Sequence, residues 1–280
     1  MGGKMIRKVL TLISIMLILL VILFPILFIF LSSFKTFEEL IRQGTGIFPK
    51  EPTLKNYISL ISAQTPVRNF PLFLFNSIKI SIATSISCIL IASLGGYGLA
   101  RFHYPGGNTL TQAMLFIYVF PTVLILIPIY KMYSDIGLLD KHIGLIIIYS
   151  ALAAPFCTWL LASFFKSIPV ELEEAAAIDG ASRAATFIKI IFPLASPGIL
   201  TIGVYSFVLA WGEYMFASIL LSSNDNKTVA LGLANLTTEQ YIEWGPLLAG
   251  SVLIILPVII FFFPVARHFI KGVMAGAVKQ

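Results

Sequence analysis

Few sizeable polar segments interrupt this apolar chain, and the residue types of one of them indicate a short helix outside the bilayer. Pro169 favours a helix start, because the first helical position needs no N–H donor. Gly180 favours a helix end, because glycine readily adopts the left-handed conformation found there. Between them lie carboxylates that the positive end of the helix dipole stabilises: Glu171, Glu173 and Glu174. The segment therefore predicts an acidic helix with a defined beginning and end.

A second short helix is predicted directly after Gly180. Ser182 is suited to cap its N-terminus, and Pro193 predicts its end before the next apolar run. An apolar stripe follows at helical spacing: Phe187, Ile190, Ile191 and Leu194. Two short helices at a sharp angle could dock a protein or lie as a connector on the membrane. A membrane-surface helix favours a basic polar face, so the acidic first helix favours protein docking.

The composition places these helices in a membrane protein. Of 280 residues, 58% are hydrophobic and 11% are charged, against about 25% charged in soluble domains. The formal net charge is +6, but its Lys and Arg are scattered near the ends of apolar runs, as interfacial anchors are. No nucleic-acid partner is expected. Cys88 and Cys157 lie inside apolar runs as small packing residues, and no histidine has a partner at metal-ligand spacing, so no metal site is expected.

Six segments are apolar and long enough to cross a bilayer, which takes about 20 residues. They cover residues 9–31, 77–100, 111–133, 143–165, 198–221 and 247–269. Prolines inside these runs predict kinked helices around a shaped interior. The first run is too long for a signal-peptide core and no A-x-A-like cleavage site follows it. It is therefore expected to remain as a membrane span.

The distribution of Lys and Arg favours both termini on the cytoplasmic side. With six spans, ten such residues fall in the predicted inside segments and eight in the outside segments. Most of the outside ones lie in the long loop 32–76, where the positive-inside rule has less force. Without that loop the count is ten against three, which predicts cytoplasmic termini. The loop 32–76 is too long for a simple turn and is expected to carry structure of its own.

Two further patterns concern the spans themselves. Small residues recur every four positions in the second span, which predicts close approach of another helix: Thr84, Cys88, Ala92, Gly96 and Ala100. Glu213 is the one acid well inside a predicted span, where a charge usually faces a cavity or a partner. It could accept a hydrogen bond from a polar substrate or make a structural bond to a neighbouring helix. Trp211 and Tyr214 are the other candidates for a substrate path, although Trp211 and Glu213 face opposite ways unless Gly212 breaks the helix.

The polar segment resembles the "EAA" loop in membrane subunits of binding-protein-dependent ABC importers. The matching residues are Glu174-Ala175-Ala176, Asp179-Gly180 and Ile191-Phe192-Pro193. Further motifs along the chain resemble the carbohydrate-importer branch and its six-span, maltose-type subunit. They are Asn76-Ser77, Gly98-Leu99-Ala100-Arg101-Phe102, Pro105-Gly106, Trp211-Gly212-Glu213-Tyr214, Trp244-Gly245-Pro246, Ala249-Gly250 and Ala275-Gly276-Ala277-Val278-Lys279. One departure is Gly212, where the family commonly has asparagine.

The resemblance implies an all-α membrane protein of six transmembrane helices, with the fold of a type I ABC importer transmembrane domain. The chain, residues 1–280, would be a single permease domain. Its parts would be a core at about 70–270, an extracytoplasmic loop at 32–76, a cytoplasmic coupling loop at 166–196 and a cytoplasmic tail at 270–280. In this family the coupling helix sits in a cleft of a separate ATPase subunit. The residues expected to couple to the ATPase are Glu174, Ala175, Ala176, Asp179, Gly180 and Pro193, with the tail residues Gly276, Lys279 and Gln280 as further contacts.

The implied function is the permease subunit of an ATP-driven importer for a sugar or oligosaccharide, in the cell membrane of a prokaryote. The expected partners are a second permease subunit, two ATPase subunits and an extracytoplasmic solute-binding protein. The chain has no nucleotide-binding motif, so ATP and Mg²⁺ are expected in the ATPase subunits and no catalytic residue or cofactor is expected here. An ion-coupled secondary transporter would need acids in several spans, and Glu213 alone supports it weakly. An intramembrane enzyme would need a Ser–His pair or an H-E-x-x-H helix, and neither is present.

Overall fold

The computed structural model describes residues 2–42, 46–62, 69–102, 105–237 and 242–277. These residues are helical almost throughout, and the described ranges contain no β-strand. They divide into two compact units, one of residues 1–70 with 232–256 and one of residues 71–231 with 257–280. The all-α class expected from the sequence is confirmed, and each unit is described by itself.

The first unit contains the N-terminal helix and the structured loop that follows it. Its helices are α1 (Gly2–Ser32), α2 (Phe37–Ile41), α3 (Lys55–Ser62) and the first part of α14 (Trp244–Ala277). The Asn56 amide donates to the carbonyls of Ser33 at 2.8 Å and Lys35 at 2.9 Å. A Cβ at Gly245 would collide with the Asn56 side chain, so this glycine lets α14 approach α3. The loop after α1 therefore carries structure of its own, as predicted.

The second unit is built on α4 (Phe70–Arg101), α7 (His142–Ser167) and α11 (Ser196–Trp211). The small-residue stripe of α4 faces α7, as predicted. A Cβ at Gly96 would lie 3.0 Å from the Ala162 backbone nitrogen, so the two backbones nearly touch. Cys88 and Ala92 are fully buried in the same core. The helix α4 begins at Phe70, seven residues before the predicted start of the second span, which shortens the predicted loop 32–76.

The predicted third span, 111–133, is wrong as a single helix. It consists of α5 (Gly107–Phe116), two 3₁₀ turns, η1 (Ile117–Val119) and η2 (Thr122–Ile125), and α6 (Leu126–Asp135). The break lies at Phe120 and Pro121, both extended. Pro121 supplies no N–H donor and disfavours the α conformation in the residue before it. The segment is apolar, but its backbone is interrupted, and none of its helices is long and apolar enough on its own to cross a membrane.

The predicted fifth span, 198–221, is also interrupted. The helix α11 ends at Trp211 with Gly212 as its C-cap, and α12 (Met215–Leu220) begins after Tyr214. The sequence raised a local break at Gly212 as a possibility, and the structure places a break there. Two short helices follow, η4 (Asn224–Asn226) and α13 (Val229–Ala234).

In the described part of the chain, four helices are long and apolar enough to cross a membrane. They cover Arg7–Ser32, Phe70–Arg101, His142–Ser167 and Trp244–Phe263. A fifth span is obtained if the bent pair Arg183–Leu194 and Ser196–Trp211, which meets at 76°, is one span. The chain is therefore a multi-pass membrane protein, with fewer uninterrupted spans than the six predicted.

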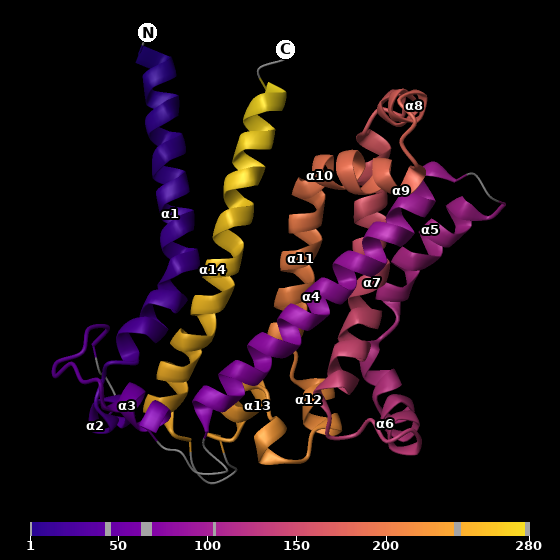
Figure 1. The fold of residues 1–280 in the computed structure, drawn as a ribbon. Coiled ribbons are helices and arrows are strands. Elements are labelled where there is room, and N and C mark those ends of the chain that lie inside the picture. Colours follow the sequence, from indigo (N-terminus) through magenta and orange to yellow (C-terminus); the bar gives the residue numbers. More distant parts are fainter. Residues whose placement is uncertain (1, 43–45, 63–68, 103–104, 238–241, 278–280) are drawn as a thin grey trace. The chain divides into compact units, whose positions relative to one another are not determined.

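The remaining short helices form the segment 166–196. They are α8 (Glu171–Ile178), α9 (Arg183–Thr186), the π-helix η3 (Phe187–Ile191) and α10 (Phe192–Leu194). Within the second unit, α8 and α9 lie at the same end as the C-terminus of α4, while α6 and α12 lie at the opposite end (Figure 1).

Candidate functional site

The acidic helix of the segment 166–196 forms as predicted. The helix α8 begins after Pro169 and ends with Asp179 as its C-cap, and Gly180 has a φ of 80°. Gly180 N–H donates to Ala177 at 3.0 Å and Ala181 N–H donates to Ala176 at 2.9 Å. This pair of bonds is the Schellman motif, which satisfies the last carbonyls of a helix. Nothing lies within 4 Å of a Cβ built at Gly180. Glycine is therefore favoured by the positive φ and not by a lack of room for a side chain.

The predicted second helix also begins as expected. The Ser182 hydroxyl accepts the Ala185 N–H at 3.3 Å and so caps α9. The helix then widens into the π-helix η3, in which Phe192 N–H bonds to the Phe187 carbonyl five residues earlier. Pro193 cannot donate to the carbonyl four residues before it, and the wider turn relieves the clash of its ring there.

The π-helix alters the predicted apolar stripe of this second helix. Ile191 is buried, and Phe187 and Ile190 are half-buried, as the stripe requires. Leu194 is exposed, because the additional residue in the turn rotates it away from the core. The helix ends at Leu194, one residue after the proline, and the chain turns through 76° into α11.

The surface of α8 divides into two faces. The exposed face of α8 is centred on residues at spacings of three and four: Glu171, Glu174, Ala175 and Ile178, with Leu172 and Ala177 exposed beside them. Ile178 is 88% exposed, although it is a large apolar residue. The opposite side turns toward the protein through Ala176, which is buried, and Glu173, which is half-buried. Asp179, Gly180 and Pro193 are exposed as well, so most of the predicted coupling residues lie on the surface.

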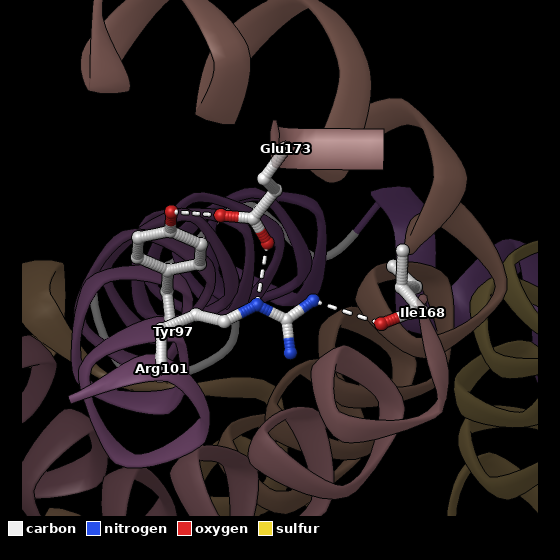
Figure 2. Close-up of polar contacts among 4 residues, drawn as sticks. All are labelled: Tyr97, Arg101, Ile168 and Glu173. Carbon is white, nitrogen blue, oxygen red and sulfur yellow. Dashed lines mark hydrogen bonds and ion pairs between the residues drawn. The ribbon is translucent and has the colours of Figure 1, made fainter. Parts of the chain in front are cut away.

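The inward carboxylate, Glu173, is held by the end of α4. Its Oε2 accepts the Tyr97 hydroxyl at 2.6 Å, and its Oε1 accepts Arg101 Nε (Figure 2). The Arg101 Nη2 donates to the Ile168 carbonyl at 3.0 Å, just after the end of α7. The Arg101 side chain is 9% exposed and that of Glu173 is 16% exposed. One guanidinium therefore joins α4, the end of α7 and α8 in a largely buried ion pair.

Aromatic rings support this ion pair. The Tyr97 ring packs against Phe187 with centroids 4.8 Å apart and against Phe165 at 5.9 Å. The guanidinium of Arg183 lies over the Phe102 ring at 6.0 Å. Tyr97, Phe102 and Arg183 border an open hollow of about 300 Å³, which Glu173 and Glu174 also line. The C-terminal ends of α4 and α7 and the start of η3 are thus packed into one cluster.

No pattern in the sequence predicted that Tyr97, Arg101 and Glu173 form one site. Arg101 was interpreted as an interfacial charge, and Glu173 as one of several acids stabilising the helix dipole. The available signal was the spacing of four between Tyr97 and Arg101, which places both on one face at the end of a span. Their meeting with Glu173 depends on the packing of α4 against α7, which no local pattern specifies.

The three candidates for a substrate path lie in different environments. Trp211 is 3% exposed and stacks on Phe207 at 5.6 Å. Glu213 is half-buried, and Tyr214 is 46% exposed. The Glu213 carboxylate accepts the Tyr149 hydroxyl at 2.6 Å and the backbone N–H groups of Phe216 and Ala217 at 3.0 and 3.2 Å. Glu213 thus caps α12 across the helix break and ties it to α7.

A polar network at the other end of the second unit was not predicted. Asp140 Oδ1 accepts the N–H groups of Ser222 and Ser223, each at 3.0 Å. Burial raises the pKa of Asp140, but these bonds outweigh it and hold the pKa below its usual value. The Asn76 amide donates to the carbonyls of Asp225 and Lys227, which gives one residue of the Asn76-Ser77 motif a structural role.

The tail predicted to reach an ATPase is described only in part. Gly276 lies in α14, which ends at Ala277. Lys279 and Gln280 lie outside the described residues.

Residues 89–274 match the family model described as "binding-protein-dependent transport system inner membrane component". The inner membrane ABC transporter permease protein YcjP of Escherichia coli is 34% identical over 265 residues, covering 94% of this chain and 93% of that protein. The trehalose transport system permease protein SugB of Mycobacterium tuberculosis is 33% identical over 257 residues, covering 91% and 92%. A bacterial ABC transporter involved in the import of the acidic polysaccharide alginate has a chain with the same fold, at a TM-score of 0.80 and 23% identity, covering 96% of this chain and 98% of that chain.

Proposed function

Because the chain belongs to the family of binding-protein-dependent transport system inner membrane components, we propose that it forms half of the translocation path of an ATP-driven importer. The exposed face of α8 carries this proposal. A surface that leaves Ile178 88% exposed, on a helix capped at its C-terminus and held to α4 through Glu173, is suited to insertion into a partner. The partner is an ATPase subunit on the cytoplasmic side.

The remaining components follow from this role. Two ATPase subunits hold ATP and Mg²⁺, and this chain is not catalytic. A second permease subunit completes the path, and an extracytoplasmic solute-binding protein delivers the substrate. The segment 166–196 and both termini face the cytoplasm, since docking to the ATPase requires it. The tail with Gly276, Lys279 and Gln280 contributes a second contact to the ATPase subunits.

The proposed substrate is a sugar or oligosaccharide. The names of two similar proteins support this class, since one imports trehalose and the other alginate. The substrate path passes the helix break at residues 212–214. Tyr214 is the exposed aromatic there and is suited to stack on a sugar ring. Trp211 and Glu213 shape the path by packing and capping, because their groups are occupied within the chain.

Uptake into proteoliposomes that contain the complete complex tests this function. Labelled trehalose or maltodextrin is supplied outside with the binding protein, and ATP is enclosed with the ATPase domains. Uptake is expected to require ATP and to persist when a proton uncoupler is added. Uptake that continues without ATP and stops with the uncoupler would instead identify an ion-coupled transporter.

A further inference from the structure

We propose that Tyr97, Arg101 and Glu173 form a rigid link by which movement of α8 is transferred to α4. They are positioning residues, and the inference rests on the proposed function, in which an ATPase moves α8. Two neighbouring carboxylates of α8 then have different roles. Glu174 faces outward on the exposed face, while Glu173 faces inward and holds the helix to its own chain.

The geometry makes this contact stiffer than an ordinary surface ion pair. Both oxygens of Glu173 are engaged, one by Tyr97 and one by Arg101 (Figure 2). Arg101 uses a different nitrogen for the Ile168 carbonyl, so its guanidinium plane is fixed at two points. Exposed ion pairs are weak, because the two side chains keep their conformational freedom and solvent screens their charges. Here burial and three bonds restrict the side chains to one arrangement.

The link also lies where a push on α8 would reach a membrane span. Tyr97 and Arg101 are on the last turns of α4, which packs on α7 with nearly touching backbones at Gly96. The ring of Tyr97 packs against Phe187, the first residue of η3, so η3 is held to the same point. Such interdigitated packing deforms little. A displacement of α8 is therefore expected to move α4 with it.

Tyr97→Phe is the cleanest variant, because it removes one hydrogen bond and keeps the ring packed on Phe187 and Phe165. Glu173→Gln removes the charge, and Arg101→Lys keeps the charge but cannot reach both partners from one nitrogen. The measurement is ATP hydrolysis by the full reconstituted complex, with and without binding protein. We expect the stimulation to fall about fivefold or more in each variant, in the range typical of coupling between sites. Basal hydrolysis should be retained.

Asp135→Asn is the matched control, since it removes an exposed carboxylate of α6, which lies at the opposite end of the second unit from α8 (Figure 1). It should leave the stimulation unchanged. A second readout reports the link directly: spin labels at Leu94 of α4 and Ala184 of α9, with the distance measured in the resting and ATP-bound states. In the wild type, the distribution of distances between the labels should be narrow, and its mean should be the same in both states. In Tyr97→Phe and Glu173→Gln the distribution should become broader.

The outcomes separate the link from the function on which it rests. Wild-type complex that shows no ATP-dependent uptake would remove the proposed function. Wild-type complex that is stimulated normally, with full stimulation and unchanged label distances in Tyr97→Phe and Glu173→Gln, would overturn the link alone.

Discussion

At the scale of single residues, the turn between α8 and α9 restricts the choice of amino acid most strongly, because the backbone there has a positive φ. Gly180 joins α8 to α9 at a φ of 80° and leaves open space around its Cα. A residue with a side chain is strained there by about 1–2 kcal/mol. Asparagine tolerates this conformation better than other residues with a Cβ. The position therefore separates an effect of backbone angle from an effect of side-chain bulk.

Gly180→Val should abolish binding-protein-stimulated ATP hydrolysis while the chain still inserts in the membrane. The β-branched side chain opposes the left-handed conformation, so the orientation of α8 changes. Gly180→Asn, the matched control, should retain most of the stimulation. Measurement of ATPase activity in purified complexes checks both variants. Normal stimulation in Gly180→Val would count against the role assigned to this turn.

Glu213→Gln should lower the free energy of unfolding by about 1–2 kcal/mol, because the capped N–H groups and the Tyr149 hydroxyl lose a charged acceptor. Uptake should fall equally for all sugars that the complex transports. Tyr149→Phe should have a smaller effect of the same kind. Thermal unfolding of the purified variants in detergent measures the change in stability. Uptake of one labelled sugar in competition with a panel of unlabelled sugars measures the sugar preference. A selective change in sugar preference at unchanged stability would assign Glu213 to the substrate.

At the scale of helices, the pair α4–α7 determines where the ends of the spans lie. Gly96 faces backbone atoms of α7, whereas Gly98 meets nothing nearer than the Phe102 ring at 4.0 Å. Gly96→Val should therefore destabilise the chain by about 1–3 kcal/mol through overpacking. Gly98→Ala should be nearly neutral. The melting temperatures of the two purified variants test the contrast, and equal values would disprove the close approach at Gly96.

The polar network around Asp140 fixes the segment between α12 and α13. Its folded pKa is lowered, so its contribution is present above the unfolded pKa of about 3.9 and is lost as the pH falls through the folded value. Asp140→Ala should lower stability at pH 7 by about 1–2 kcal/mol, and the difference from wild type should shrink below pH 4. Asp135→Ala, which removes an exposed carboxylate, is the control. Unfolding midpoints of both variants are measured from pH 3 to pH 7. The same pH dependence in Asp140→Ala and Asp135→Ala would contradict this role.

The sequence predicted the elements that depend on local chemistry. The start and end of α8, the Ser182 cap and the small-residue stripe of α4 all follow from residues close together in the chain. The breaks at Pro121 and Gly212 were harder to place. Hydrophobic length identifies a span, but whether a proline or glycine interrupts it depends on which neighbours satisfy the freed backbone groups.

The link of Tyr97, Arg101 and Glu173 could not be predicted for a different reason. Its residues are separated by about 70 positions, and each has an adequate local explanation as an anchor or a helix-dipole charge. Only the packing of α4 on α7 brings them together. The same holds for Glu213, whose neighbours Phe216 and Ala217 become capped groups because the helix breaks before them.

At the scale of the whole molecule, exposed apolar side chains occur in two different settings. Large apolar side chains are exposed along the candidate spans, where lipid or the proposed second permease subunit would cover them. Ile178 is different, because it lies on an acidic helix that anionic lipid repels. The account therefore depends on a protein, the ATPase subunit, that covers the exposed face of α8.

Site-specific photo-crosslinking from position 178 in native membranes tests this claim most directly. A photoreactive residue at Ile178 should form a crosslink to the ATPase subunit, and its yield should change between the nucleotide-free and ATP-bound states. The same residue at Leu94, an exposed position of α4, should give no ATPase crosslink. Absence of any ATPase crosslink at position 178 in complexes that hydrolyse ATP, or a crosslink to lipid in its place, would contradict the account.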